Sequence, residues 1–339
     1  MKIGTDQYNT FDTMTMDCWN DRVYYEGKEF PAGQFAAEIL NFAGVIHDPL
    51  LERITVLTAL VDDLSTAEKS KRHDIAAQLK PLLHDTVSWL YTCPPFCYCE
   101  EQRAYEALEH ALSEERLDRD YEEEEAHLPY LALSFCEPIL RILVAIYNFC
   151  LLIRAFEKKY LRRAKRRNAD AFAKAAHECF DEDDSFLILL EQMPFGEVEE
   201  FFAYPRVVTG FKYFQDENDE EKWKTAQRVI CRRTIDFYVF DLVNGLHHGH
   251  APSQCQGCGR YFLTTNGHTP KYCDGVAPQD NRYTCRQYGA MKHQKEQNKQ
   301  HPVYRLFNTR TDTIRKHHWR GKISDELRRE ALYLAGKYR

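Results

Sequence analysis

The chain has 339 residues, of which 44% are hydrophobic and 13% aromatic, and its formal net charge is −7. A length of this order suggests about two domains, and the apolar content is ample for a packed core. Twelve cysteines in so long a chain exclude a small disulfide scaffold and favour a reducing compartment. We therefore expect a cytoplasmic protein.

Charge is unevenly distributed along the chain. Residues 251–339 hold 17 lysines and arginines against 7 aspartates and glutamates, a charge of +10. The totals of 45 basic and 52 acidic residues leave 28 and 45 for residues 1–250, a charge of −17. A basic segment beside an acidic one indicates a polyanionic partner for the basic part, a contact between the two parts, or both.

Two segments bear on targeting and on membranes. Residues 1–17 lack a basic start followed by an apolar core, so we expect no signal peptide. The most apolar run, residues 142–153, is too short to span a bilayer and is flanked by Arg141 and Arg154. We interpret it as a buried helix and expect no membrane partner.

The first predicted elements are two hairpin-like strands within residues 1–30 and a helix over 35–46. Asp48-Pro49 predicts the start of the next helix, because aspartate caps helices and proline fits their first position. Apolar side chains then recur at helical spacing from Leu50 to Leu64, which predicts one buried stripe.

A third helix is predicted by a capping-box pattern at Ser65 and Glu68, with a kink at Pro81. It breaks at Cys93-Pro-Pro-Phe-Cys97-Tyr-Cys99, where three thiols could begin a second metal site. No fourth ligand follows at a natural spacing, so we favour a turn whose cysteines pack against the core.

The middle of the chain alternates charged runs and helices. Residues 114–125 are mostly acidic, which indicates a solvated helix end or loop or, alternatively, a docking surface for the basic tail. Pro138 predicts the start of a long central helix that reaches about Tyr160. The basic run at 161–167 is interpreted as that helix's C-terminus rather than as a phosphate-binding patch.

Less regular patterns follow. A short helix is predicted over 169–180 and strands within 186–214. Acidic residues at 216–221 precede Trp223 and predict the N-terminus of another helix. That helix closes at the histidine run 247–250, interpreted as an exposed helix end rather than as metal ligands.

Four further cysteines have the spacing of a metal site. Cys255 and Cys258 form C-x2-C, a spacing that lets two thiolates reach one tetrahedral zinc, and Cys273 and Cys285 follow. His268 is an alternative to one thiolate, although four cysteines need no further ligand. Because four protein ligands leave no open position, we expect one structural zinc and no catalytic role.

These cysteines belong to a longer pattern, C-x2-C-G-x-Y-F … Y-C-D … T-C-R-x-x-G-A … G-K-I. It resembles the C-terminal region of an uncharacterised bacterial family, catalogued as a domain of unknown function and found in gut bacteria. The resemblance covers roughly the last quarter of the chain and implies a zinc module without an established activity. The matching residues are Cys255, Cys258, Gly259, Tyr261, Phe262, Tyr272, Cys273, Asp274, Thr284, Cys285, Arg286, Gly289, Ala290, Gly321, Lys322 and Ile323.

The pattern is more distantly similar to CGNR-type zinc fingers, bacterial modules of treble-clef type that are thought to bind nucleic acid. Those modules have few residues between their last two cysteines, whereas this chain has the eleven from Asp274 to Thr284. The similarity implies a small zinc-ribbon or treble-clef-like module with a nucleic-acid partner.

The tail after Cys285 is predicted to be helical. His301-Pro302 starts one helix, Gly321 ends it, and Ser324 caps the last. Outward positions of these helices are basic. The candidate phosphate contacts are Arg286, Lys292, Lys295, Lys299, Arg305, Lys316 and Arg320.

Together these patterns predict a mainly α (α+β) protein. An acidic, mainly helical body spans 1–250, and a zinc-binding module with a basic helical tail spans 251–339. We expect the module to bind DNA or RNA in a regulatory role, and the acidic body is a candidate for binding a protein. The alternative is an interaction or scaffold protein whose zinc is purely structural. A metal-dependent nuclease is disfavoured, because no His–His or Asp–His constellation surrounds the cysteines, and we expect no enzyme activity.

Overall fold

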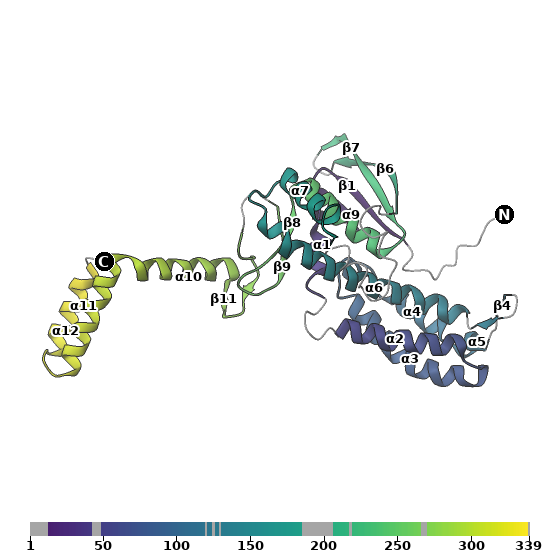
Figure 1. The fold of residues 1–339 in the computed structure, drawn as a ribbon, viewed down its shortest axis with the longest axis horizontal. Coiled ribbons are helices and arrows are strands. Elements are labelled where there is room, and N and C mark those ends of the chain that lie inside the picture. Colours follow the sequence, from purple (N-terminus) through teal and green to yellow (C-terminus); the bar gives the residue numbers. More distant parts are fainter. Residues whose placement is uncertain are drawn as a thin grey trace. The chain divides into compact units, whose positions relative to one another are not determined.

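The computed structural model divides the chain into two compact units. The first unit comprises Met1–Ser253 and Arg260–Thr269, and the second comprises Gln254–Gly259 and Pro270–Arg339. The fold is mainly helical with small sheets, as the sequence predicts (Figure 1). The residues that the structure describes are 13–42, 49–118, 121–123, 126–128, 130–184, 206–216, 219–265 and 270–337.

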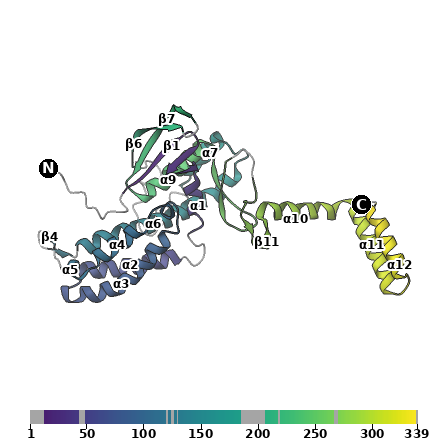
Figure 2. The ribbon, with the colours of Figure 1, turned by 180° about the vertical axis from the view of Figure 1, so that it is seen from behind.

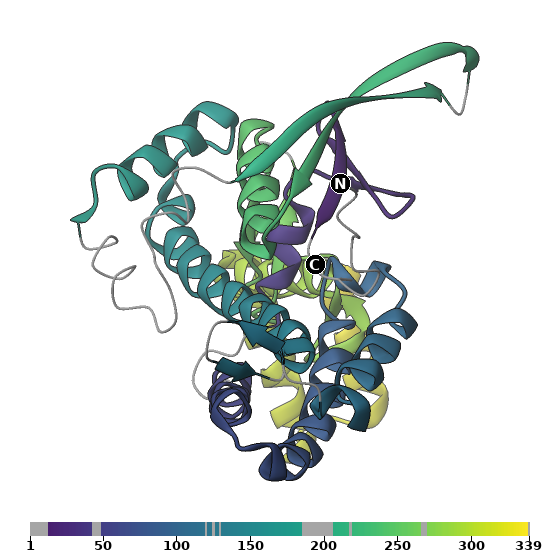
Figure 3. The ribbon, with the colours of Figure 1, turned by 90° about the vertical axis from the view of Figure 1, so that its right-hand side faces the viewer.

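A five-stranded antiparallel sheet with strand order β3-β2-β1-β7-β6 forms one side of the first unit. Glu26 and Gly27 join β2 to β3 and both have positive φ, 46° and 72°, as a two-residue type I′ turn requires. Figure 3 shows the long β6–β7 hairpin reaching past the ends of the shorter strands. The strands are β1 (Met14–Trp19), β2 (Arg22–Tyr25), β3 (Lys28–Pro31), β6 (Val207–Asp216) and β7 (Asp219–Cys231).

One face of this sheet carries the core of the first unit. Met14, Met16 and Cys18 alternate along β1 and are all buried, as the two-residue period of a strand requires. The ring of Tyr25 on β2 lies 5.5 Å from the ring of Phe237, which belongs to a helix under the sheet. The two helices packed there are α1 (Gln34–Ile39) and α9 (Thr234–His247).

Helices α1 and α9 meet at a close backbone contact. The buried Asp241 carboxylate on α9 accepts hydrogen bonds from the amides of Gly33 and Ala36, both at 2.9 Å, and so caps the start of α1. A Cβ atom added at Gly245 would lie 2.8 Å from the Gly33 Cα atom and 3.0 Å from the Ala32 carbonyl oxygen. Glycine at 245 is therefore required for the two helices to approach this closely.

Among the other helices of the first unit, α6 packs against α2, α4, α5 and α9, α3 packs against α2, α4 and α5, and α7 packs against α9 (Figure 1). Their bounds are α2 (Pro49–Thr66), α3 (Lys69–Leu90), α4 (Gln102–Ala111), α5 (Glu114–Leu117), α6 (Tyr130–Lys159) and α7 (Ala169–Phe180), with 3-10 turns at Phe96–Tyr98 and Leu161–Arg163 and a small hairpin of β4 (Tyr121–Glu123) and β5 (Ala126–Leu128). The apolar stripe predicted for α2 is buried, namely Leu50, Ile54, Leu57, Val61 and Leu64.

Helix α6 is long and apolar enough to cross a membrane by length and composition alone. The apolar segment extends over Ala132–Arg163, so the sequence argument based on residues 142–153 underestimated its length. However, 61% of its most apolar window is buried inside the structure, and Phe149 packs 5.2 Å from the ring of Tyr238 on α9. These contacts are those of a core helix and are compatible with a soluble protein.

Two predicted helix starts are wrong. Helix α6 begins at Tyr130 and contains Pro138, because burial of its apolar side chains compensates for the missing amide donor. The predicted capping box does not form: Ser65 lies inside α2 and donates to the carbonyl of Asp62 at 2.7 Å. Glu68, at the N-cap of α3, makes no capping hydrogen bond with its side chain.

The start of the helix predicted near Trp223 is also wrong: this segment is strand β7, and the helix that ends at the histidine run begins only at Thr234, as α9. Acidic residues before an aromatic residue suit a helix start, but β7 gains ladder hydrogen bonds from both β1 and β6. Strands were expected within 186–214; β6 occupies the described end of that range, and residues 186–205 lie outside the described part of the chain. The helix expected over 35–46 is shorter than predicted: α1 ends at Ile39, residues 40–42 form a turn, and residues 43–46 lie outside the described part of the chain.

The second unit contains a small hairpin and three helices. His301 and Pro302 start α11 as predicted, and the Ser324 hydroxyl accepts from the Leu327 amide at 3.3 Å and so caps α12. Figure 2 shows α11 and α12 lying side by side. The elements are β10 (Val276–Ala277), β11 (Asp280–Thr284), α10 (Cys285–Gln300), α11 (Pro302–Trp319) and α12 (Asp325–Lys337). A further hairpin of β8 (Ala251–Gln254) and β9 (Tyr261–Thr264) flanks the C-x2-C turn in the chain.

The contact between α1 and α9 predicts a strong effect of Gly245→Ala. The added methyl group overlaps the backbone of Gly33, so we expect a loss of about 1–3 kcal/mol in the free energy of unfolding. Chemical denaturation of the full chain, followed by circular dichroism, measures this loss.

Gly210→Ala is the matched control, because a Cβ atom at Gly210 meets nothing within 4 Å. Equal stability of the two variants would contradict the close packing of α1 on α9.

Candidate metal centre

The second unit brings four cysteine sulfurs together. The Sγ atoms of Cys255, Cys258, Cys273 and Cys285 all lie within 4.8 Å of one another. Those of Cys258 and Cys273 are 3.6 Å apart, far longer than a disulfide bond of roughly 2.05 Å. Four sulfurs about 2.3 Å from a central ion in a tetrahedron lie roughly 3.8 Å from one another. The cluster therefore fits a metal ion bound by four thiolates, as the spacing predicts.

A tight turn places the first two sulfurs. The backbone reverses at Gly259, whose φ is 75°, and the Gly259 amide donates to the Cys255 carbonyl at 2.9 Å. The amides of Gly257 and Cys273 both donate to the Cys255 Sγ atom at 3.3 Å. These N–H groups stabilise negative charge on that sulfur, as expected of a metal-binding thiolate.

The fourth cysteine is the first residue of helix α10. Thr284 caps this helix: its hydroxyl accepts from the Gln287 amide at 3.2 Å, and the Gln287 side chain accepts from the Thr284 amide at 2.9 Å. The Cys285 amide donates to the Gly275 carbonyl at 2.7 Å, which ties the helix start to the segment after Cys273. The positive end of the helix dipole favours a thiolate at Cys285.

Cys255 differs in acidity from Cys273 and Cys285. Burial opposes ionisation of Cys255, but hydrogen bonds from backbone amides outweigh it and lower the pKa of this thiol to about 7. Burial and the neighbouring thiols raise the pKa of Cys273 to about 11, and they raise the pKa of Cys285 as well. A bound cation supplies the charge that lets all four lose their protons.

Residues 203–339 match the model of DUF6076, a family of unknown function. The match covers the described β6, β7 and α9 and the second unit with its cysteines. A search of curated proteins and a search of solved structures found no match. The resemblance to a family of unknown function, inferred from the cysteine pattern, is therefore confirmed over this part of the chain.

Close packing requires glycine at one position of the DUF6076 region, which was not predicted from the sequence. A Cβ atom added at Gly289 would lie 2.4 Å from the Cε2 atom of Tyr272, so α10 rests directly on this ring. The capping role of Thr284 was likewise missed, although the Thr-x-x-Gln spacing to Gln287 is a capping-box signal. Both features fix the start of α10 and with it the position of Cys285.

The other side chains considered as metal ligands from the sequence do not belong to this cluster or lie outside the described residues. His268 falls outside the described residues. Within the described part of the chain, Cys93, Cys97 and Cys99 belong to no group of side chains that could share a metal ion. Cys93 is buried and the Cys99 Sγ atom lies 3.3 Å from the Tyr25 hydroxyl, so these two cysteines pack against the core as predicted. The prediction is wrong for Cys97, which is exposed.

The histidine run at 247–250 joins no such group among the described residues either. Its interpretation as an exposed helix end is wrong for His250. This side chain is buried, and its Nδ1 atom lies 2.9 Å from the Ala32 carbonyl oxygen.

The predicted phosphate contacts of the DUF6076 region all lie on its surface. Arg286, Lys292, Lys295, Lys299, Arg305, Lys316 and Arg320 are exposed. On α10, Lys292, Lys295 and Lys299 follow helical spacing and share one face. Arg286 pairs with Asp274 at 2.9 Å, so its charge is partly neutralised.

The cluster predicts that serine at any one of Cys255, Cys258, Cys273 or Cys285 removes most of the bound metal, because an alcohol is a far poorer ligand than a thiolate. Elemental analysis of the purified full-length variants gives the metal content per chain. Cys93→Ser is the matched control and should keep the wild-type content. Full metal content in two or more of the four variants would contradict the site.

Chelation predicts selective loss of the second unit. The buried side chains described there are those of Cys255, Cys273, Ala277, Cys285 and Thr311, too few for an apolar core. Metal binding supplies about 10–16 kcal/mol in small zinc modules. A strong chelator should therefore make residues 270–337 protease-sensitive, while the helical circular dichroism of the first unit persists. Collapse of the entire helical signal would show that the first unit also depends on the metal.

Proposed function

We propose that the second unit is a structural zinc module that binds nucleic acid through phosphate groups, with little sequence preference. Zinc is the metal that a four-thiolate tetrahedral set favours, and such a closed set leaves no position for substrate or water. The order of a C-x2-C turn, a hairpin and a helix that begins with a ligand supports a treble-clef-like arrangement.

A surplus of positive charge beside the metal site carries the nucleic-acid proposal. Residues 286–339 hold 14 basic and 5 acidic side chains, a charge of +9. The face of α10 that carries Lys292, Lys295 and Lys299 is exposed, and the basic positions Arg305 and Lys316 on α11 are exposed as well. One acidic residue, Asp312, lies between Arg305 and Lys316 on α11. Its carboxylate is 3.5 Å from Arg315, so its negative charge is paired. Exposed cations in rows are what phosphate backbones bind.

The alternative function is that of an interaction or scaffold protein. It draws support from large apolar side chains that are exposed on α11 and α12, among them Leu306, Trp319 and Tyr333, at 59%, 86% and 72%. Such residues are typical of protein interfaces. The two functions differ in their response to salt and to charge reversal.

If about five of the candidate cations contact phosphates of duplex DNA, log K should fall with log salt at a slope of roughly −4 to −5. Reversing two charges by Lys292→Glu with Lys295→Glu should weaken binding to every sequence and flatten that slope. Fluorescence anisotropy with the full, metal-loaded chain measures both quantities.

The control is Lys165→Glu with Arg166→Glu, which reverses two exposed charges in the first unit. Equal weakening of DNA binding by the two double variants would show that Lys292 and Lys295 are not specific phosphate contacts. Absence of any binding at low salt would leave the interaction module as the better account.

A further inference from the structure

The outer face of the five-stranded sheet carries a cavity of about 500 Å³ in the first unit. It lies on the face opposite the core, where side chains of β1, β2, β6 and β7 stand in register. Asp17 pairs with Tyr24 on β2 and with Arg228 on β7, and Gly210 on β6 pairs with Arg228. A volume of this size suits a small organic ligand, since such sites commonly measure about 300–1,000 Å³.

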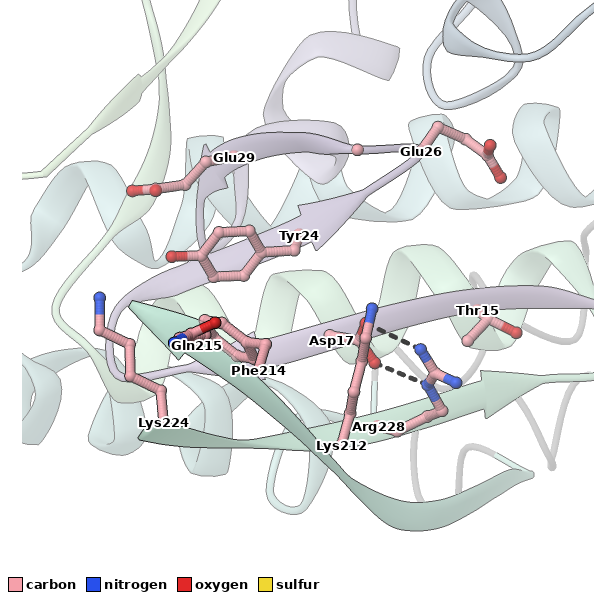
Figure 4. Close-up of a pocket in the computed structure, with 11 residues that line it drawn as sticks. Thr15, Asp17, Tyr24, Glu26, Glu29, Lys212, Phe214, Gln215, Lys224 and Arg228 are labelled. Atoms are coloured by element: carbon pink, nitrogen blue, oxygen red, sulfur yellow. Dashed lines mark hydrogen bonds and ion pairs between the residues drawn. The ribbon is translucent and has the colours of Figure 1, made fainter. Parts of the chain in front are cut away.

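Three charged side chains form the floor of this cavity. Arg228 donates to both carboxylate oxygens of Asp17, at 2.7 and 3.0 Å, and the Lys212 ammonium donates at 3.0 Å (Figure 4). Burial of Asp17 opposes its ionisation, but the hydrogen bonds from Arg228 and Lys212 outweigh it and lower the pKa of this carboxyl. The cluster therefore holds one carboxylate against two cations and keeps a surplus positive charge.

The surplus positive charge of this cluster is accessible from solvent. The Asp17 side chain is only 9% exposed, whereas those of Lys212 and Arg228 are 46% and 39% exposed. An ammonium has three donors, and the bond to Asp17 uses one of those on Lys212. An anion entering the cavity thus meets two cations that are already held in place.

Aromatic rings form the next part of the wall. The rings of Tyr24 and Phe214 lie 5.5 Å apart and are tilted by 57°. Figure 4 shows them beside the cationic floor, with Lys224 on their other side. The Lys224 ammonium lies 4.3 Å from the centre of the Trp19 ring. Such rings offer apolar faces on which a planar ligand can stack.

Carboxylates form the opposite rim. Glu26, in the turn between β2 and β3, and Glu29 on β3 both line the cavity. Glu29 pairs with Arg22 at 3.5 Å and is about half exposed. Acceptors of this kind suit the amino groups of a ligand whose anionic end lies on the floor.

We propose that this pocket binds a nucleobase joined to a phosphate, with the phosphate at Lys212 and Arg228 and the base stacked on Tyr24 and Phe214. A zwitterionic amino acid would pair with the charged side chains but would not stack on the aromatic rings. An apolar compound would leave the cations of the floor without an anionic partner. The site lies wholly within the first unit and does not rest on the function proposed for the second.

Calorimetric titration of the full chain with AMP and with UMP tests the site. We expect one nucleotide per chain, and binding of adenosine alone or inorganic phosphate alone that is at least about tenfold weaker, because each makes only part of the contacts. Lys212→Gln and Phe214→Ala should each weaken nucleotide binding by about tenfold.

Two matched controls test the specificity of these effects. Tyr213→Ala removes a ring from the neighbouring position, which faces the opposite side of β6 and is 66% exposed. Lys174→Gln removes the charge of a lysine on α7 that is also paired with a carboxylate, at Glu178, and is 75% exposed. Both should bind nucleotide as the wild type does. Lack of nucleotide binding at millimolar concentration, or equal losses in controls and pocket variants, would overturn the proposal.

The phosphate and base can come from a free nucleotide or from a single-stranded nucleic acid. A short single-stranded oligonucleotide, tested on the Lys292→Glu, Lys295→Glu background, distinguishes these sources. Tighter binding of the oligonucleotide than of AMP, lost with Phe214→Ala, identifies a strand as the ligand. Binding of AMP but not of the oligonucleotide identifies a free nucleotide. Because the α10 charges lie outside the pocket, AMP binding should be unchanged on this background, which separates a failure of this site from a failure of the second unit.

Discussion

Convergence of four thiols on one point is the constraint on which the second unit depends. Its hairpin and the start of α10 are fixed by hydrogen bonds to segments that carry the cysteines, such as that from the Cys285 amide to the Gly275 carbonyl. Apart from the cysteines, Ala277 and Thr311 are the buried side chains described there. A metal ion held by the four cysteines would supply the stabilisation that an apolar core supplies elsewhere.

The first unit is held together in the opposite way. Its sheet, α1, α9 and α6 bury a continuous apolar core, and the close approach at Gly245 and the cap from Asp241 fix how α1 meets α9. With the core on one face of the sheet, the other face is available for polar groups. The cluster of Asp17, Lys212 and Arg228 is therefore a surface feature on a rigid platform, as a binding site requires.

Local patterns predicted much of this architecture, and non-local pairing explains what they missed. The apolar stripe of α2 and the C-x2-C turn each depend on residues that lie close together in the sequence, so both were predictable. Strand β7 was misread as helix because its pairing with β1 joins residues such as Asp17 and Arg228, which lie 211 positions apart. The sheet pocket was missed for the same reason. Its charged residues Asp17, Lys212 and Arg228 lie on three different strands, and nothing in the sequence places those strands side by side.

The central claim concerns the chemistry at Cys255, Cys258, Cys273 and Cys285, and X-ray absorption at the zinc edge addresses it directly. The purified full-length chain should give a single shell of four sulfur ligands about 2.3 Å from zinc. Each cysteine-to-serine variant should lose that shell or show a lighter ligand at shorter distance. A spectrum dominated by nitrogen and oxygen neighbours, or a folded second unit that carries no metal at all, would contradict the account.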